Sequence, residues 1–179
     1  MTPEQKAREQ IDRQLEWAGW LVQGYSAMNI AAGLGVAVRE FPLTTGHADY
    51  LLYADCEAIG VVEAKPVGHT LTGVETQSDK YLSDLPKGLP SDRLPLPFAY
   101  ETTGKETHFT NNLEVHARSR KVFTFHRPEE LIRLAKLDKQ VRSRLREYPP
   151  LDVTRLWGGR RSRASINSKN HLLRTSRVR

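Results

Sequence analysis

The sequence predicts one α/β domain, with a mixed β-sheet of about five or six strands flanked by helices. Three observations lead to this fold class. Apolar residues recur at helical spacing in residues 3–17 and 128–147. Short apolar runs bounded by Gly, Pro or charged residues lie between them. In addition, 39% of the 179 residues are hydrophobic, enough for a sizeable core.

Periodicity and turn residues place the elements before residue 66. Residues 3–17 carry an apolar stripe, and Gly19 ends the predicted helix. A strand is expected at 36–41. Two apolar runs, residues 51–53 and 58–62, flank a polar break of hairpin length and predict an antiparallel pair. The helical stripe consists of Ala7, Ile11, Leu15 and Ala18.

The second half continues the same pattern. Residues 72–85 read as a helix that ends before Pro86, and the proline-rich residues 86–97 as a surface loop. Pro128 is expected to start a helix that runs to residue 147, before Pro149 and Pro150. Short strands are expected at 98–101, 107–110 and 122–125, the first two as a hairpin.

Charged residues interrupt the predicted two-strand element. Asp49 opens one strand, and Glu63 and Lys65 end the next, so the hairpin returns them to the same edge. Alternation along a strand puts Glu63 and Lys65 on one face while Ala64 points away. Two carboxylates with a backbone carbonyl suit Mg²⁺. The pattern is therefore typical of metal-assisted phosphodiester cleavage, with Lys65 orienting a water molecule or offsetting charge in the transition state.

An E-x-K triplet by itself is weak. Residues 4–6 form another one, on the predicted first helix with no acidic strand before it. The alternative for Glu63 and Lys65 is that they are the first solvated residues after a strand that Pro66 ends. Asp49 and the hairpin break ahead of the triplet favour the functional interpretation.

Six segments occur in order along the chain, at residues 38–43, 48–52, 62–66, 68–75, 109–111 and 122–128. Together they resemble the amino-terminal nuclease domain of the restriction (R) subunit of type I restriction–modification enzymes, which belongs to the PD-(D/E)xK superfamily. The resemblance covers residues 3–155 and implies a restriction-endonuclease-like fold. Ala48 stands where the family usually has a proline.

The resemblance implies a site and its partners. The Mg²⁺ site would consist of Asp49, Glu63 and the backbone carbonyl of Ala64, with Lys65 catalytic. The family's Q-x-x-x-Y motif is matched by Gln77 and Tyr81, which lie four apart on one helical face and would support the lysine or contact DNA. Double-stranded DNA and the methylation and specificity subunits would be the partners. ATP serves only full-length relatives.

Charge divides the chain unevenly. The net charge is +6, but residues 153–179 hold eight Lys or Arg and no acid, which leaves 19 basic against 21 acidic residues elsewhere, a net of −2. DNA contact therefore needs a local patch, and a solvated charged face is the alternative for its last three members. The candidates are Lys65, Lys80, Arg118, Arg120 and Lys121.

Residues 156–179 read as a basic, disordered tail, since they lack periodicity and hydrophobic content. In the family an ATP-driven translocase follows a linker here, whereas this sequence contains no G-x-x-x-x-G-K-[ST] loop. We expect a truncated R subunit with an out-of-frame or unrelated end. A functional DNA-binding tail is the competing idea.

The remaining chemistry-bearing residues point to no second site. His47 and His69 lack partners at zinc spacing and read as loop residues. The single cysteine, Cys56, falls at the hairpin tip, and with the lack of a signal peptide or long apolar run it predicts a cytoplasmic protein without a membrane span. Glu9 and Glu16, acids on the first helix, are expected to be solvated.

Two functions stay open at this point. One is a Mg²⁺-dependent endonuclease domain that cleaves double-stranded DNA. The other is a catalytically silent remnant that keeps the fold and acts as a DNA-binding or subunit-docking module. The intact site residues favour the first, and the missing motor favours the second.

Overall fold

The computed structural model describes residues 3–44, 46–66, 68, 71, 85–86, 88–91 and 93–147. The chain divides into two compact units, residues 1–143 and 144–179. The sheet and the first helix belong to the first unit.

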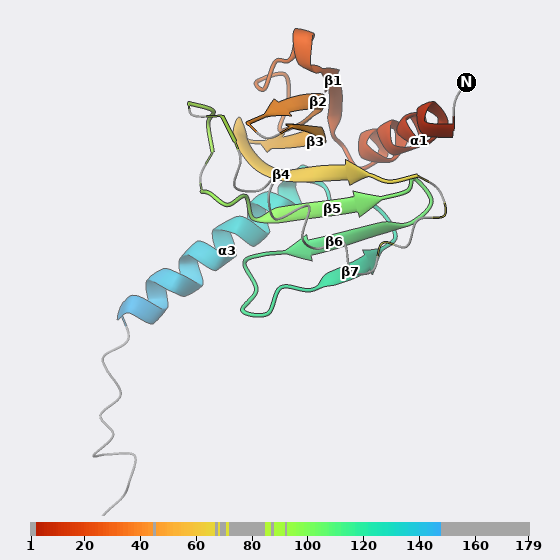
Figure 1. Cartoon of the computed structure of the whole chain (residues 1–179). Helices are drawn as coiled ribbons and strands as arrows, with labels where there is room; N and C mark the ends of the chain where they lie inside the picture. Colours follow the sequence, from red (N-terminus) through yellow and green to blue (C-terminus); the bar gives the residue numbers. More distant parts are fainter. Residues whose placement is uncertain are drawn as a thin grey trace, which may run out of the picture. The chain divides into compact units, whose positions relative to one another are not determined.

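One seven-stranded mixed sheet organises this unit, with its strands side by side in chain order (Figure 1). β1 pairs with β2 and β4 with β5 in parallel, and the other neighbours are antiparallel. The strands are β1 (Leu21–Gly24), β2 (Gly35–Leu43), β3 (Gly46–Ala54), β4 (Glu57–Ala64), β5 (Phe98–Thr102), β6 (Thr107–Asn111) and β7 (Ser119–Val122). The helices are α1 (Pro3–Trp17), the short 3-10 helix η1 (Tyr25–Ala27) and α3 (Pro128–Glu147).

Most of the predicted elements are confirmed. Both terminal helices have the expected bounds. The mixed sheet has one strand more than expected, because β1 was not predicted, and β7 lies at residues 119–122 rather than 122–125. The helix expected at 72–85 lies outside the described residues except for Leu85. The 33 residues between β4 and β5 (65–97) exceed the dozen or so that a parallel crossover requires.

Two apolar clusters cover the two faces of the sheet. On one face, Ile11 and Leu15 of α1 and Leu131 of α3 pack against strand residues such as Tyr50 and Tyr100. The cluster on the other face contains Val38, Leu51, Tyr53, Val61 and Ala99 of the strands. Leu96 belongs to the same cluster and is 0% exposed. The expectation that the proline-rich residues 86–97 form a surface loop is therefore wrong at Leu96.

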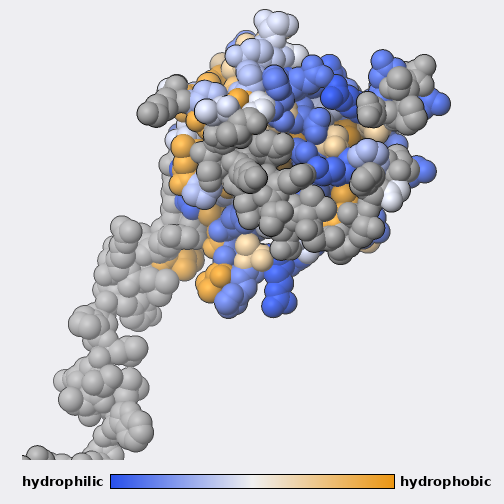
Figure 2. All heavy atoms as spheres, viewed as in Figure 1, coloured by the Kyte–Doolittle hydropathy of each residue, from blue (hydrophilic) through white to orange (hydrophobic). Residues whose placement is uncertain are grey.

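The outer side of α1 is polar. Many hydrophilic side chains lie at the upper right of Figure 2, on the side where Figure 1 places this helix. Among the described residues, no helix is both long enough and apolar enough to cross a membrane.

The β3–β4 hairpin turn contains the cysteine, as expected. Ala54 pairs with Glu57, and the two residues between them, Asp55 and Cys56, have φ values of 54° and 63°. Two positive φ values in a two-residue loop define a type I′ turn, for which Asp-Gly is a preferred sequence. The turn thus forms although a side chain occupies its second position.

We expect Cys56→Gly to raise the free energy of unfolding by about 1 kcal/mol, because glycine adopts the left-handed conformation without steric cost. The Cys56 thiol makes only a weak 3.6 Å contact with the Ile30 carbonyl, so little is lost with it. Urea denaturation of both proteins measures the change. Cys56→Ser keeps the backbone cost and is the control. Equal stability of the Gly and Ser variants would contradict the prediction.

Candidate functional site

Asp49 lies where β3 and β4 stop pairing through their backbones. The last backbone pair toward this end joins Tyr50 and Val62. Beyond it, the Ala64 backbone N–H donates a 2.8 Å hydrogen bond to Asp49 Oδ2. The carboxylate thus takes the place of a strand carbonyl, which fixes it at the end of β4.

Glu63 and Lys65 form an ion pair beside it. Lys65 Nζ lies 2.9 Å from Glu63 Oε1, and the two side chains are only 17% and 13% exposed. They share a face, as strand alternation predicts. The Lys65 backbone N–H donates to the Thr102 carbonyl at 2.7 Å, so β5 holds this segment after β4 has ended.

A further carboxylate lies next to this pair. Glu101 is the β5 partner of Glu63 in the parallel register, and it is 6% exposed. Burial raises the pKa of the Glu63 carboxyl, Lys65 partly opposes the shift, and the charges of Asp49 and Glu101 raise it further. Negative charge is therefore concentrated around Glu63. Sequence reasoning missed Glu101, because nothing local distinguishes it from an ordinary strand residue.

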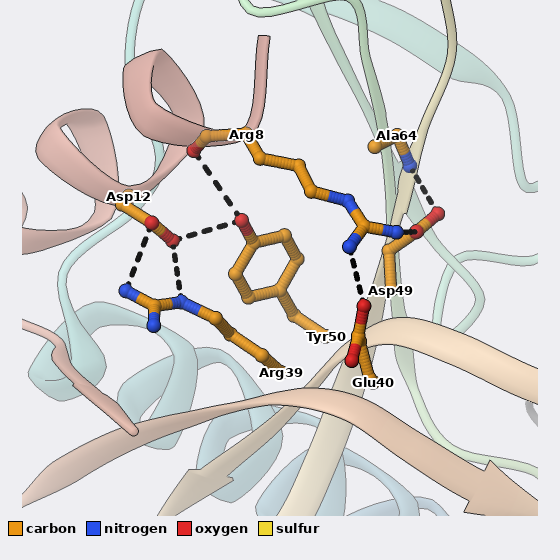
Figure 3. A network of polar contacts seen from close by, with 7 residues as sticks. All are labelled: Arg8, Asp12, Arg39, Glu40, Asp49, Tyr50 and Ala64. Atoms are coloured by element: carbon orange, nitrogen blue, oxygen red, sulfur yellow. Dashed lines mark hydrogen bonds and ion pairs between the residues drawn. The ribbon is translucent and has the colours of Figure 1, made fainter. Parts of the chain in front are cut away.

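Arg8 of α1 reaches the same place from outside the sheet (Figure 3). Its Nη2 lies 3.6 Å from Asp49 Oδ1, and its Nη1 donates a hydrogen bond to Glu40 of β2. That hydrogen bond raises the pKa of Arg8. Sequence reasoning missed this residue too, since 41 positions separate Arg8 from Asp49 in the chain.

A second polar group, next to the first in Figure 3, ties α1 to the sheet. Asp12 accepts hydrogen bonds from the Tyr50 hydroxyl at 2.8 Å and from Arg39 Nε at 3.0 Å. Burial and the Asp12 charge raise the pKa of Tyr50, which stays protonated as the donor. This group anchors the helix whose Arg8 contacts Asp49.

The structure brings some of the predicted residues together and separates others. Asp49, Glu63, Ala64 and Lys65 meet at the adjoining ends of β3 and β4. Lys121 is in register with Glu63 across the sheet but lies three strands away, about 14 Å at the usual strand spacing. Its ammonium group forms an ion pair with Glu106. The other predicted residues outside this group divide into two sets. Arg118, Arg120, His47, Glu9 and Glu16 are exposed, whereas His69, Gln77, Lys80 and Tyr81 lie outside the described residues.

Arg120 is engaged elsewhere. Its guanidinium makes a bidentate pair with Glu114, with contacts of 2.7 and 2.6 Å. Its strand position pairs with Phe109, which packs in the cluster on the α1 and α3 side of the sheet. Arg120 therefore lies on the opposite face from Lys121 and from the Glu63–Lys65 pair.

These oxygen ligands are compatible with a hard cation that needs few ligands from the protein. Asp49 and Glu63 supply carboxylate oxygens, and Mg²⁺ is usually bound through one or two carboxylates while it keeps several waters. Within the described part of the chain, no group of three or more His, Cys, Asp or Glu side chains is arranged to hold a metal ion. The two carboxylates would therefore suit a Mg²⁺ ion that completes its coordination with water.

Comparison with known proteins identifies the fold. No protein-family model and no curated protein matches the chain. Among solved structures, a similar chain is the fragment structure of a proposed HsdR subunit of a type I restriction enzyme from Vibrio vulnificus YJ016. The two are 22% identical, with a TM-score of 0.58 over 78% of this chain. The fold of this chain is similar to that of one part of the fragment.

The expected α/β fold class, similar to that of a restriction-enzyme fragment, is thereby confirmed. The chain spans only 26% of the length of the Vibrio chain. The likeness therefore concerns one part of that protein.

The raised pKa of the partly buried Glu63 carboxyl predicts that stability depends on pH. Because its pKa is raised in the folded protein, the protonated form stabilises the fold fully below the ordinary value of 4.5, and this contribution is lost as pH rises through the raised value. Glu63→Gln cannot ionise. We expect it to melt at a higher temperature than the wild type at pH 7, with the difference vanishing below about pH 4.

Thermal unfolding followed by circular dichroism from pH 4 to pH 8 measures this effect. Glu57→Gln is a matched control, because Glu57 is an exposed residue at the start of the same strand. A melting difference between Glu63→Gln and wild type that stays constant with pH would contradict the assignment.

Proposed function

We propose that this chain is a Mg²⁺-dependent nuclease domain of a type I restriction enzyme R subunit, cleaving phosphodiester bonds of double-stranded DNA. The observation that carries the proposal is the convergence of Glu63, Lys65 and Asp49 at one end of the β3–β4 pair. These are the residue types and the spacing of the PD-(D/E)xK site. The fold shared with the HsdR fragment supports the same assignment.

Asp49 and Glu63 are the residues that would hold the cation. When bound, Mg²⁺ supplies Lewis-acid polarisation of a phosphate oxygen and lowers the pKa of water. The hydrogen bond from the Ala64 N–H keeps Asp49 oriented. Burial, and to a lesser extent the charges of Asp49 and Glu101, raise the pKa of Glu63, and a cation would oppose this shift and favour the ionised form.

Lys65 has the catalytic role that its position allows. Its side chain is only 17% exposed, and its ammonium group lies 2.9 Å from Glu63 Oε1, so it stays next to the carboxylates. There it orients the attacking water or stabilises negative charge that develops on the phosphate, and low solvent access strengthens the interaction. Gln77 and Tyr81 remain proposed as supporting residues. DNA would be the substrate, and methylation and specificity subunits would be partners in a longer assembly.

Metal binding tests this function directly. Titration calorimetry with Mg²⁺ and Mn²⁺ is expected to show binding to the wild type and strongly reduced binding to Asp49→Asn, which keeps the shape but removes the charge. The wild type is also expected to nick or linearise closed plasmid DNA with Mg²⁺ and not with EDTA. A wild-type chain that binds neither cation and leaves plasmid intact would favour the catalytically silent module instead.

A further inference from the structure

Arg8 lies beside a proposed cation ligand and is also open to solvent. Its Nη2 is 3.6 Å from Asp49 Oδ1, and 47% of its side chain is exposed. Figure 3 shows the guanidinium between Glu40 and Asp49, pointing from α1 toward the end of β4 where Ala64 lies. A ligand held at Asp49 would therefore come within reach of this group.

We propose that Arg8 binds a phosphate oxygen of the DNA backbone next to the phosphodiester that a cation at Asp49 and Glu63 would hold. This inference rests on the proposed function and adds a substrate-binding residue from α1 to a site otherwise built by strands. A guanidinium has five N–H donors in one plane, and it binds phosphate oxygens through paired hydrogen bonds.

The present contact with Asp49 can be exchanged for a phosphate contact. Charge-assisted N–H···O hydrogen bonds measure about 2.7–2.9 Å, whereas Arg8 Nη2 lies 3.6 Å from Asp49 Oδ1. Asp49 has a shorter partner in the Ala64 N–H, at 2.8 Å. If Arg8 Nη2 turned toward a phosphate, no short hydrogen bond to Asp49 would be broken.

The side chain of Glu40 accepts a hydrogen bond from Arg8, and its backbone has an unusual conformation. It lies inside β2 with φ of 51°, a left-handed conformation that glycine adopts at lower cost. The β2–β3 register passes from the Arg39–Tyr50 pair to the Phe41–Ala48 pair, which leaves Glu40 opposite Asp49 without a backbone pair. Strained residues of this kind concentrate at functional sites. Here the strain accompanies a carboxylate that fixes the Arg8 guanidinium.

Arg8 is not needed to dock α1. The helix buries Ile11 and Leu15 completely, and Asp12 connects it to Tyr50 and Arg39. Arg8→Gln is therefore expected to unfold at the same urea concentration as the wild type, so an effect on DNA binding would not come from a lost fold.

Duplex affinity at several salt concentrations tests the proposal. The assay uses Ca²⁺, a hard cation with the same preference for oxygen ligands, and a parallel series in EDTA. Arg8→Gln is expected to bind at least tenfold more weakly, and the negative slope of log K against log[salt] should become shallower by about 0.9, the value for one phosphate contact. Arg8→Lys should keep the slope. Arg133→Gln is the matched control, because Arg133 is an exposed arginine paired with Glu130 on α3.

Mg²⁺ calorimetry without DNA separates phosphate binding from positioning of Asp49. Arg8→Gln removes a positive charge near the site, so its Mg²⁺ affinity should equal or exceed that of the wild type. An unchanged salt slope, or an Mg²⁺ affinity as low as that of Asp49→Asn, would overturn the proposal. Failure of the proposed function looks different, because the wild type itself would then bind no Mg²⁺ and cleave nothing.

Discussion

Glu63→Ala and Lys65→Ala are each expected to lower the rate of Mg²⁺-dependent plasmid cleavage by at least about 100-fold. Glu63 is proposed to supply a cation ligand, and its removal would leave Asp49 as the one proposed carboxylate ligand. Lys65 is proposed to act in the transition state, where a mostly buried ammonium group interacts more strongly with developing charge than an exposed one does. Lys65→Arg should recover little, because the guanidinium has a different shape and donor geometry.

Matched controls separate this chemistry from general charge effects. Glu57→Ala removes an exposed acid from the same strand, and Lys105→Ala removes an exposed base after β5. Both should cleave at the wild-type rate. Glu63→Gln adds a second control, since it should be at least as stable as the wild type at pH 7 and still inactive. Cleavage by Glu63→Ala and Lys65→Ala at the wild-type rate would remove the nuclease assignment for this site.

Trp20→Ala is expected to have the largest effect on stability, a loss of about 3–5 kcal/mol. Trp20 is 2% exposed, packs with the cluster between the sheet and the helices, and donates from Nε1 to the His126 carbonyl at 2.9 Å. Its removal leaves a cavity and takes away the partner of a backbone acceptor. Trp20→Phe keeps much of the apolar volume and loses the donor, so its cost should be smaller.

The neighbouring Trp17 provides the control. It is the last residue of α1, three positions before Trp20, but it is 82% exposed, so Trp17→Ala should stay within about 0.5 kcal/mol of the wild type. Urea denaturation followed by circular dichroism gives both values. Similar losses for the Trp17 and Trp20 variants would contradict the packing described above.

Local signals explain which parts of the fold could be predicted. The α1 stripe, Pro128 at the start of α3 and the polar break at Asp55 and Cys56 act over a few residues, and all three elements form as expected. β1 was missed because its four residues lack alternation and it pairs in parallel with β2. β7 was displaced because the apolar run that starts at Val122 contains Phe123, which is fully exposed in the structure.

The candidate site divides in the same way. The strand pattern predicted that Glu63 and Lys65 share a face and that Asp49 meets them across the hairpin. Arg8 and Glu101 come from elements distant in sequence, and only the tertiary arrangement of α1 and β5 places them here. The catalytic roles remain predictions until metal binding and cleavage are measured.

The left-handed conformation of Glu40 also determines how β2 divides its side chains between the two layers. Val36 and Val38 before it and Phe41 and Leu43 after it all belong to the same cluster. Even-numbered residues face this cluster before Glu40, and odd-numbered residues face it afterwards. With unbroken alternation, Phe41 would share the α1 side with Arg39. The aromatic chain of Tyr25, Phe41 and Tyr53, with ring centroids 5.3 and 6.2 Å apart, exists because one acidic residue reverses the phase of its strand.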